Sequence, residues 1–362
     1  MAETVEAAAA TPYPVVVGTG SNIAAEVSEA LQPGTAVVLT DSNVGPRHAG
    51  SVTADLESGG WRVLEVIEVP AGESSKSLAV YEEAIHHLAA SGLTRDGTLF
   101  ALGGGVVGDL AGFVAATYMR GISFVALPTT LLAMVDSSVG GKVGVDLPEG
   151  KNLVGAFLRP RLVAADLARL DTLPDREISC GLAEVVKMGL LAGGSFFGNL
   201  RLIGDARTRN AEALRTLVLD CVRFKADVVT EDELEMGRRA ILNYGHTIGH
   251  ALEAVADYAL PHGEAIAAGM TAAAHLSREK LGTNFVALHE DLLQSAGLPA
   301  KAPAADPEKI LAAMGSDKKR RSGDGSGDSP AHRFVLLEDI GRPVWGVPVT
   351  NEEARRAIEA IA

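Results

Sequence analysis

The sequence has few cysteines, few aromatic residues and a shortage of positive charge. Only Cys180 and Cys221 occur in 362 residues, too few for a disulfide framework, so they favour a reducing compartment such as the cytoplasm. The 32 Lys and Arg residues are outnumbered by 46 Asp and Glu, which gives a formal net charge of −14. This excess disfavours nucleic acid and anionic membranes as partners, and admits a small anionic ligand only where cations gather locally.

Long apolar runs and an N-terminal basic stretch are also missing. No uninterrupted apolar segment reaches the length of a membrane-spanning helix, and residues 1–6 are acidic, so neither a membrane span nor a signal peptide is expected. Hydrophobic residues nevertheless make up 47% of the chain, with 40 glycines and only 4% aromatics. This balance suits an α/β enzyme with many close backbone approaches, and the length suggests about two domains.

The first part of the chain alternates short β-branched runs with segments of helical spacing. The helical segments lie at residues 24–31 and 77–90. The runs that predict strands are residues 15–17, 36–39, 62–67, 98–102 and 123–127. Strands and helices in alternation predict a Rossmann-like parallel sheet with ligands at the carboxyl ends of its strands. We therefore expect an α/β domain over residues 1–172.

The character of the sequence changes after residue 172. Residues 322–330 are rich in Gly, Ser and Asp and predict a loop, residues 333–337 and 344–347 predict short strands, and a short helix closes the chain. Before them lie Ala- and Leu-rich segments of helical spacing, at residues 176–191, 210–230, 246–255, 263–281 and 285–296. These segments predict a mainly α-helical second domain over residues 173–362.

A glycine-rich segment follows the strand predicted over residues 98–102. Gly103, Gly105 and Gly108 fit the pattern G-x-G-x-x-G, in which glycines let backbone amides approach a pyrophosphate at the positive end of a helix. The acidic residue expected about twenty positions later is absent, so this is not a standard Rossmann first turn, and a plain tight connection is the alternative. The candidate nucleotide contacts are Gly104, Gly105, Val106, Val107 and Gly108, with Asp41, Glu73 and Lys76 as weaker additions.

The densest group of chemically active side chains lies in the helical part. His246 and His250 are four residues apart, so they share one face of the predicted helix, and His262 and Glu264 follow. Imidazoles on one face, completed by a carboxylate from elsewhere, are typical of a catalytic zinc site that keeps a position open for substrate. A helix with a few solvated or core histidines is the alternative, but three histidines within seventeen residues, flanked by glycines, favour a site.

Several motifs, in this order along the chain, are together far more specific than any one alone. They are GGGVVGDLAG (103–112), MRG (119–121), PTT (128–130), VDSSVGGK (135–142), GKNLVGAF (150–157), GLAEVVK (181–187), LNYGHTIGH (242–250), HGE (262–264) and SDKK (316–319). The chain resembles, from about Pro14 to its last helix, the 3-dehydroquinate synthase family of sugar-phosphate cyclases.

The resemblance implies an α/β NAD-binding domain, a mainly helical metal-binding domain and an active site in the cleft between them. It implies a carbon–oxygen lyase that converts 3-deoxy-D-arabino-heptulosonate 7-phosphate into 3-dehydroquinate and inorganic phosphate, a step of the shikimate pathway. The expected cofactors are NAD and Zn²⁺, with Co²⁺ as an alternative because both ions accept the same ligands. A cytoplasmic homodimer is expected on the same grounds.

The resemblance also implies which residues bind the cofactors. The metal ligands that it implies are Glu184, His246 and His262, with His250 as a polar or acid–base residue beside the metal. Spacing alone offers His246 and His250 as the ligand pair, so the choice of Glu184 comes from the resemblance. The NAD contacts that it implies are Glu73, Lys76, Gly104, Gly105, Asp109, Thr129, Thr130, Lys142, Lys151 and the turn formed by Arg169, Leu170, Asp171 and Thr172.

A substrate with a phosphate and a carboxylate needs positive charge, which an acidic chain must gather locally. Arg120 and Arg239 suit bidentate contacts, because Arg presents a planar fork to an oxyanion whereas Lys acts as a point charge. Asp136 is expected to orient a hydroxyl of the substrate or of the nicotinamide ribose, and His250 to relay a proton through water. The predicted substrate contacts are Arg120, Asp136, Lys142, Lys151, Asn152, Lys187, Lys225, Arg239, Asn243, His250, Lys318 and Lys319.

Other interpretations compete with this one. One is a related cyclase that acts on a different sugar phosphate, although the segments 108–109 and 140–142 match the dehydroquinate branch of the family. Another is a metal-dependent polyol dehydrogenase, which would consume NAD stoichiometrically. A dinucleotide-binding regulatory protein without catalysis should have a broken ligand set, whereas Glu184, His246 and His262 are all present. Cys180, four residues before Glu184, is either a packing residue or a weak competitor for the metal.

Overall fold

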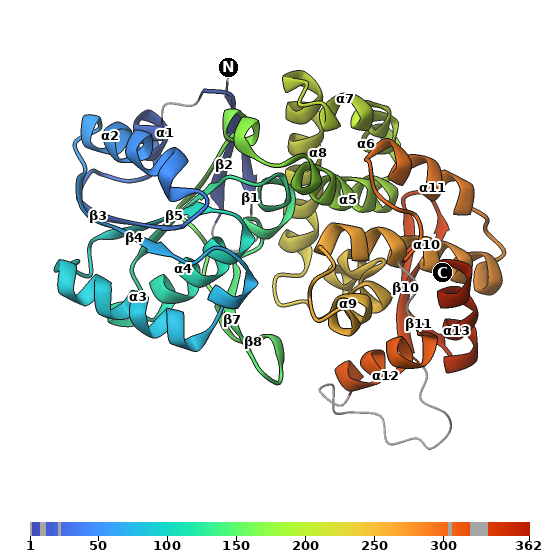
Figure 1. The fold of residues 1–362 in the computed structure, drawn as a ribbon. Helices are drawn as coiled ribbons and strands as arrows, with labels where there is room; N and C mark the ends of the chain where they lie inside the picture. Colours follow the sequence, from blue (N-terminus) through green and yellow to red (C-terminus); the bar gives the residue numbers. More distant parts are fainter. Residues whose placement is uncertain (1, 8–11, 21–22, 303–305, 319–331) are drawn as a thin grey trace. The chain divides into compact units, whose positions relative to one another are not determined.

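The computed structural model describes residues 2–7, 12–20, 23–302, 306–318 and 332–362. The chain folds into two compact units (Figure 1). The first comprises Met1–Pro174 with Lys225–Thr230, and the second comprises Asp175–Phe224 with Glu231–Ala362. The boundary predicted at residues 172/173 lies close to the end of the first segment, but the return of 225–230 to the first unit has no counterpart in the prediction.

A seven-stranded sheet forms the centre of the first unit (Figure 1). Its strand order is β1-β2-β9-β6-β5-β3-β4, and all neighbouring strands are parallel except β1 and β2. The predicted α/β fold with a parallel sheet is confirmed. The strands are β1 (Glu3–Ala7), β2 (Tyr13–Gly18), β3 (Thr35–Asp41), β4 (Arg62–Val69), β5 (Thr98–Gly103), β6 (Ser123–Pro128) and β9 (Leu162–Asp166).

Helices cover both faces of this sheet (Figure 1). Successive side chains of a strand point to opposite faces, so the continuous apolar runs of the central strands need partners on both sides. On one face, Val27 and Leu56 pack into a buried cluster with strand residues such as Phe100. The helices on that face are α1 (Ile23–Ala30) and α2 (Gly50–Ser58), and those on the other are α3 (Leu78–Ser91) and α4 (Gly105–Thr117).

Several elements of the first unit, among them one helix and one central strand, were not predicted. The five predicted strands fall inside β2 to β6, and both predicted helices match α1 and α3 to within one residue at each end. Helix α2 was missed, and so was β9, although β9 pairs with β2 and β6 inside the sheet. The sequence of β9, LVAAD, is continuous with an Ala- and Leu-rich stretch that has no β-branched alternation. Its pairing with two strands overrides that local preference.

A separate antiparallel hairpin in the first unit carries several of the predicted site residues. It consists of β7 (Lys142–Leu147) and β8 (Gly150–Phe157). Helix α4 packs closely against it, because a Cβ atom at Gly112 would lie 2.3 Å from Cγ1 of Val143. The hairpin therefore holds Lys142 close to the helix that follows the glycine-rich turn.

The second unit is mainly helical, as predicted, with one two-stranded hairpin. Each of the five predicted helical segments corresponds to a helix within two residues at either end. Helix α10 lies at its centre and contacts α5, α9, α11, α13 and β10. The elements are α5 (Asp175–Ala192), α6 (Gly194–Asn199), α7 (Ile203–Arg207), α8 (Ala211–Glu231), α9 (His246–Val255), α10 (His262–Leu281), α11 (Val286–Ser295), α12 (Pro307–Lys318), β10 (His332–Asp339), β11 (Arg342–Val349) and α13 (Asn351–Ala360).

Helices α5 and α10 approach each other unusually closely. A Cβ atom at Gly263 would lie 2.3 Å from the Cα atom of Cys180 and 2.5 Å from its carbonyl oxygen. Both distances are shorter than atoms tolerate, so the crossing requires glycine at this position. The amino end of α10 therefore sits directly on the backbone of α5.

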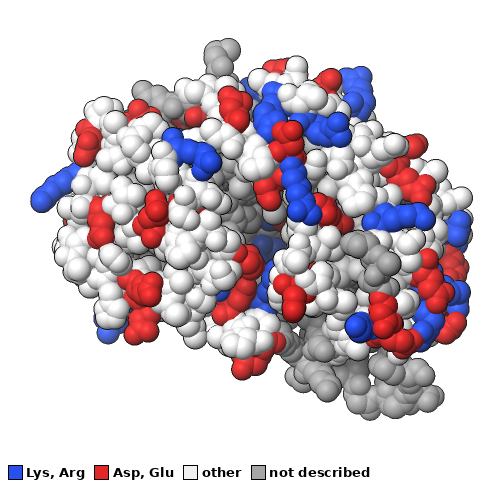
Figure 2. All heavy atoms as spheres, viewed as in Figure 1, with Lys and Arg blue, Asp and Glu red and all other residues white. Residues whose placement is uncertain are grey.

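The surface agrees with the acidic composition. On the face drawn in Figure 2, basic side chains are interspersed with acidic ones and form no continuous patch among the residues described there. Within the described segments, no helix is long and apolar enough to cross a membrane.

Part of the sequence prediction falls outside the described residues. Lys319 and the loop predicted over 322–330 lie in the undescribed stretch 319–331. Lys318 is the last residue of α12, but its side chain is not described.

Candidate functional site

Three side chains from separate helices of the second unit meet at one point. Glu184 lies in the middle of α5, His246 is the first residue of α9, and His262 is the first residue of α10. The Nε2 atoms of His246 and His262 lie 3.7 Å and 3.6 Å from Oε1 of Glu184. One donor atom from each residue lies within 4.8 Å of the others, a span that suits a single metal ion.

The surroundings of Glu184 suit a bound cation. Its side chain is 0% exposed, and Oε1, the oxygen that faces the two imidazoles, has no hydrogen-bond partner among the described residues. The Lys187 ammonium, one turn along α5, forms an ion pair with it and is itself 1% exposed. Buried polar atoms are nearly always hydrogen-bonded, so an unsatisfied carboxylate oxygen that faces two imidazoles indicates a metal ligand.

The three candidate ligands have shifted pKa values. Burial acts to raise the pKa of Glu184, but the Lys187 ammonium and His262 outweigh it and lower this pKa to about 2. Burial, followed by Lys187 and the neighbouring histidines, lowers the pKa of His246 well below its usual value. Burial also acts to lower the pKa of His262, but Glu184 and Glu253 raise it to about 9. A metal ion would therefore displace a proton from His262.

The second nitrogen of each imidazole is held by the protein. Nδ1 of His246 lies 3.0 Å from the carbonyl oxygen of Tyr244, and Nδ1 of His262 lies 3.5 Å from Oε2 of Glu253. Partners of this kind fix the tautomer and direct Nε2 toward the metal. Glu253 was not among the predicted site residues, although it lies seven positions after His246 and thus on the same face of α9.

His250 lies beside the three candidate ligands. Its ring centroid is 5.0 Å from that of His246 and 6.1 Å from that of His262. It also groups with Glu253 and His262, whose ligating atoms lie within 4.8 Å of its own. The pair suggested by spacing, His246 and His250, thus shares one face, while Glu184 and His262 complete a set around His246.

A buried pair lies behind His246. The Tyr244 hydroxyl is 2.8 Å from Nε2 of His289 on α11, and both side chains are 0% exposed. Neither residue was predicted to belong to the site. Burial lowers the pKa of His289 to about 4.

The His289 shift predicts a specific loss of stability in acid. Its folded pKa of about 4 lies below the unfolded value of 6.5, so the unfolded chain binds more protons between these values. Stability should fall as pH drops from about 6.5 to 4, by up to about 3 kcal/mol from this group alone. Urea unfolding of the wild type and of His289→Gln, which does not titrate, should diverge over this window. Parallel pH profiles would contradict the burial of a neutral imidazole.

The glycine-rich turn has the predicted strand–turn–helix form. β5 ends at Gly103, Gly104 is the N-cap, and α4 begins at Gly105. The backbone N–H of Thr129, after β6, donates to the carbonyl of Gly103 at 2.9 Å. The Thr129 hydroxyl is buried and has no hydrogen-bond partner among the described residues.

Two more side chains line the same turn. A Cβ atom at Gly104 would lie 3.0 Å from Thr130, and one at Gly105 would lie 3.0 Å from the Ser137 hydroxyl. The Ser137 hydroxyl is also buried without a partner in the described part of the chain. Ser137 was missed by the sequence prediction. Unpartnered hydroxyls beside the amino end of a helix fit a polar ligand such as a phosphate group.

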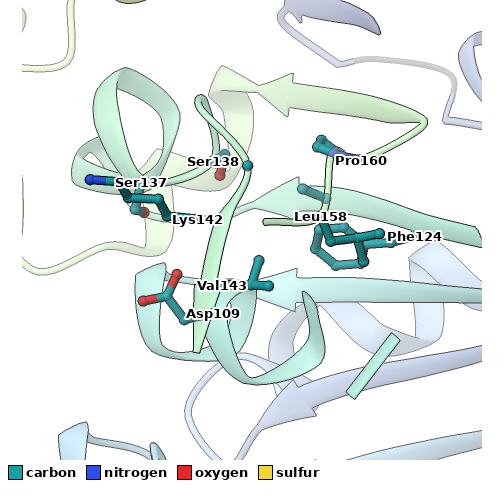
Figure 3. Close-up of a pocket in the computed structure, with 11 residues that line it drawn as sticks. Asp109, Phe124, Ser137, Ser138, Lys142, Val143, Leu158 and Pro160 are labelled. Atoms are coloured by element: carbon teal, nitrogen blue, oxygen red, sulfur yellow. The ribbon is translucent and has the colours of Figure 1, made fainter. Parts of the chain in front are cut away.

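A small cavity lies next to this turn. Its volume is about 20 Å³, room for a single water and far less than a dinucleotide needs. Figure 3 shows Asp109, Ser137 and Lys142 gathered toward one end, and Phe124, Leu158 and Pro160 toward the other. Lys142 is exposed and lines this cavity together with Gly108.

Several predicted NAD contacts bind each other. Lys76, only 5% exposed, forms an ion pair with Asp109 at 2.6 Å and a hydrogen bond with the side-chain oxygen of Asn152. The backbone N–H of Asn152 donates to Asp146 at 2.7 Å. Asp146 was not predicted. Lys76 therefore links α4 to the β7–β8 hairpin.

Other predicted cations of the first unit are also paired. Lys151 lies 3.3 Å from Glu73, and Lys225 contacts Asp136 through both the carboxylate, at 2.5 Å, and the carbonyl oxygen, at 2.6 Å. Arg120 is exposed in a left-handed turn, with φ of 65°. Backbone conformations of this kind are costly for residues other than glycine and concentrate at functional sites.

A short loop before α9 positions two predicted substrate contacts of the second unit. The carboxylate of Asp232 accepts hydrogen bonds from the backbone N–H groups of Met236, Gly237 and Arg239, at 2.8, 2.8 and 2.9 Å. The Arg239 guanidinium, 3% exposed, donates to the carbonyl of Glu233 at 2.6 Å. The Asn243 amide donates to the Glu235 carboxylate at 3.0 Å.

Of the remaining predicted residues, Asp41 and the Arg169–Thr172 turn have structural partners. Oδ1 of Asp41, the last residue of β3, accepts from the backbone N–H groups of Asn43 and Val44 at 2.8 and 3.0 Å. Thr172 contacts His48 at 2.9 Å between side chains. Arg169 and Leu170 are buried, and Asp171 is exposed.

Cys180 does not belong to the metal cluster. Burial raises its pKa to about 11, so it is a neutral thiol at physiological pH, whereas metals bind the thiolate. The groups of possible metal ligands among the described residues do not include it. It serves as a packing residue under Gly263.

Two family models together match most of the chain. The model of the 3-dehydroquinate synthase N-terminal region matches residues 66–180, and that of the 3-dehydroquinate synthase C-terminal region matches residues 181–320. The junction between the two models lies within α5, three residues before Glu184.

The chain is also similar to known proteins over nearly its full length. It is 46% identical over 354 residues to the 3-dehydroquinate synthase of Acidithiobacillus ferrooxidans (strain ATCC 53993 / BNL-5-31), covering 96% of this chain and 93% of the relative. A structure of 2-deoxy-scyllo-inosose synthase with carbaglucose-6-phosphate, NAD⁺ and Co²⁺ is 29% identical, with a TM-score of 0.90 and coverage of 99% and 100%. A 2-epi-5-epi-valiolone synthase from Streptomyces hygroscopicus subsp. jinggangensis 5008, with NAD⁺ and Zn²⁺ bound, is 26% identical, with a TM-score of 0.86 and coverage of 99% and 98%.

Proposed function

The chain belongs to the 3-dehydroquinate synthase family, and we propose that it performs the reaction of this family. It converts 3-deoxy-D-arabino-heptulosonate 7-phosphate into 3-dehydroquinate and inorganic phosphate, a step of the shikimate pathway. Within one turnover the substrate is oxidised at one hydroxyl, loses phosphate by β-elimination, is re-reduced, and closes its ring in an intramolecular aldol step. The net reaction consumes no NAD.

The observation that carries this proposal is the arrangement of Glu184, His246 and His262. Two Nε2 atoms within 3.7 Å of Oε1 of the fully buried Glu184, an oxygen without a hydrogen-bond partner among the described residues, fit a divalent ion with three protein ligands. We assign Zn²⁺ or Co²⁺ to this site, where the ion supplies Lewis acidity toward substrate hydroxyls. His250, beside the ligands, exchanges protons between the substrate and solvent.

NAD is proposed to bind at the amino end of α4, where it would supply a reversible hydride acceptor for the substrate. The backbone amides of Gly104 and Gly105 and the positive end of the helix dipole favour its pyrophosphate. The buried hydroxyls of Thr129 and Ser137, unsatisfied among the described residues, add hydrogen-bond donors. The other proposed NAD residues are Asp41, Glu73, Lys76, Val106, Val107, Gly108, Asp109, Thr130, Lys142, Lys151 and Arg169 to Thr172.

The charged groups of the substrate are assigned to cations with fixed positions. Lys187 is held by Glu184 and Arg239 by the Asp232 loop, so neither has to be ordered when the anion binds. Binding groups that are already fixed retain more of their interaction energy in the transition state. The other proposed substrate contacts are Arg120, Asp136, Lys142, Asn152, Lys225, Asn243, Lys318 and Lys319.

Phosphate release provides the direct test. Protein freed of cofactors should release orthophosphate from the heptulosonate phosphate only when both Zn²⁺ or Co²⁺ and NAD are added. NAD far below the substrate concentration should sustain many turnovers, without net accumulation of NADH at 340 nm. Chelation with EDTA should stop release, and release that continues after metal depletion would refute the metal-dependent site.

The same assay separates the competing functions. Net NADH formation from a polyol, without phosphate release, would indicate a polyol dehydrogenase. Phosphate release from glucose 6-phosphate, but not from the heptulosonate phosphate, would indicate another sugar-phosphate cyclase. Binding of NAD without any turnover would indicate a regulatory protein.

A cytoplasmic homodimer is proposed as the working form. The cysteine content supports a reducing compartment, because both Cys180 and Cys221 are buried free thiols. Assembly can be measured by analytical ultracentrifugation of the full chain, where a sedimenting mass near the 37.5 kDa monomer would contradict the dimer.

A further inference from the structure

Hydrogen bonds connect the candidate metal ligand His246 to the interior of the second unit. Nδ1 of His246 lies 3.0 Å from the carbonyl oxygen of Tyr244. The hydroxyl of Tyr244 lies 2.8 Å from Nε2 of His289, and Nδ1 of His289 lies 2.7 Å from the carbonyl oxygen of Phe285. Tyr244 and His289 are both 0% exposed, and their polar side-chain atoms contact each other and the Phe285 carbonyl. The proposed reaction gives neither residue a role.

The direction of these hydrogen bonds follows from chemistry. The Phe285 carbonyl can only accept, so Nδ1 of His289 carries a hydrogen. Burial lowers the pKa of His289 to about 4, so the ring is neutral at pH 7 and Nε2 can only accept. The Tyr244 hydroxyl therefore donates to Nε2. One tautomer and one hydroxyl orientation satisfy both contacts.

The same reasoning fixes the tautomer of His246. The carbonyl of Tyr244 accepts, so Nδ1 of His246 carries the hydrogen. The lone pair of Nε2 is then free, and this atom lies 3.7 Å from Oε1 of Glu184. Nε2 can bind a metal without first losing a proton. The position of the Tyr244 carbonyl thus decides whether His246 is ready for the metal.

The backbone after Tyr244 has little freedom to adjust. Gly245, the N-cap of α9, has φ of 79°, and a Cβ atom there would lie 2.7 Å from the Met270 side chain and 2.9 Å from its backbone nitrogen. The backbone of Tyr244 is therefore held by the left-handed turn at Gly245, and its side chain is held by the contact with His289. A displacement of the Tyr244 side chain would therefore also move the Tyr244 carbonyl.

We propose that the Tyr244–His289 pair is a positioning device for His246, holding the Tyr244 carbonyl where it directs Nε2 of this ligand toward the metal. The inference rests on the proposed function, because it takes His246 to be a metal ligand. Outer partners of histidine ligands contribute about 10- to 100-fold to metal affinity. Since this pair acts through one intervening carbonyl, we expect an effect at the lower end of that range.

A role in packing alone predicts a different result. A buried pair that only fills the core would affect the free energy of unfolding and leave metal affinity unchanged. Removing one partner leaves the other unsatisfied, whereas replacing both with apolar groups can be nearly neutral for stability. The Phe285 carbonyl keeps a partner in either case, because it also accepts from the backbone N–H of His289 at 3.0 Å. Stability and metal affinity can therefore be separated.

The experiment compares Tyr244→Phe, His289→Leu and the double variant with the wild type. Co²⁺ is titrated into metal-free full-length protein against a competing chelator, and its visible absorption spectrum reports the ligand geometry. Each single variant should bind Co²⁺ about 10-fold more weakly and show an altered spectrum. The double variant should bind no more weakly than the single ones, while recovering part of the stability to urea that they lose.

Two further variants make the outcome decisive. Tyr118→Phe removes another buried tyrosine hydroxyl, which donates to the Leu93 carbonyl at 2.9 Å in the first unit, and should leave Co²⁺ affinity unchanged. Wild-type affinity, within twofold, and an unaltered spectrum in all three test variants would overturn the inference. Co²⁺ binding that is equally tight in Glu184→Gln would instead overturn the proposed metal site itself.

Discussion

Replacing His262 with alanine is expected to remove the metal and abolish phosphate release. The substitution leaves Glu184 and His246 as the remaining ligands, and two protein ligands do not provide the three-ligand set of a catalytic zinc site. Metal content after dialysis should fall from about one ion per chain to near zero. The α/β unit should remain folded and bind NAD, because its core contains none of these side chains.

A matched control lies on the same helix. His275 is also on α10, where its ring contacts Arg278 at 3.3 Å. His275→Ala should keep metal and activity, so a loss in both variants would point to a general effect on α10. Full metal content and full turnover in His262→Ala would remove His262 from the ligand set.

Replacing Lys187 with methionine is expected to destabilise the metal-free protein strongly. Lys187 and Glu184 are 1% and 0% exposed, and the ammonium lowers the pKa of Glu184 against the opposing effect of burial. Breaking a buried ion pair by removing one partner costs about 3–5 kcal/mol when the other charge stays buried without compensation. His262 remains 3.6 Å from Glu184 and compensates part of its charge, so we expect a loss at the lower end of this range. Urea unfolding of the metal-free variant measures this loss directly.

Two comparisons test the cause of that loss. Added Zn²⁺ should raise the melting temperature of Lys187→Met more than that of the wild type, because a bound cation compensates the Glu184 charge. The double variant Glu184→Gln, Lys187→Met should recover stability without metal but gain nothing from Zn²⁺. Unchanged stability of Lys187→Met would show that Glu184 does not depend on this ammonium.

Local sequence patterns predicted the fold well where the pattern and the packing agree. The runs that became β2 to β6 are short and β-branched, and the helices α5, α8, α9, α10 and α11 follow an apolar period. Strand β9 was missed because its sequence, LVAAD, shows no alternation and is defined by pairing with β2 and β6. The assignment of residues 225–230 to the first unit was also missed, because α8 is continuous from Ala211 to Glu231.

The residues of the site also differ in whether a local sequence pattern reveals them. Their spacing places His246, His250 and Glu253 on one face of α9. Only the two histidines were recognised, because a glutamate in a helix is usually an ordinary surface residue. Glu184 lies on another helix, and no local pattern connects it with the histidines, so resemblance to a family had to supply it. Tyr244 and His289 are 45 residues apart and meet only through tertiary packing.

The crossing of α5 and α10 has a consequence for the metal site. Glu184 follows Cys180 by one turn of α5, and His262 precedes Gly263, which rests on the Cys180 backbone. A methyl group at position 263 would push α5 and α10 apart. It would also separate the Glu184 carboxylate from the His262 imidazole, which must bind the same ion. The distance between the Glu184 carboxylate and the His262 imidazole therefore depends on Gly263, a residue without a side chain. A substitution at position 263 can therefore disrupt the metal site as much as a substitution of one of its ligands.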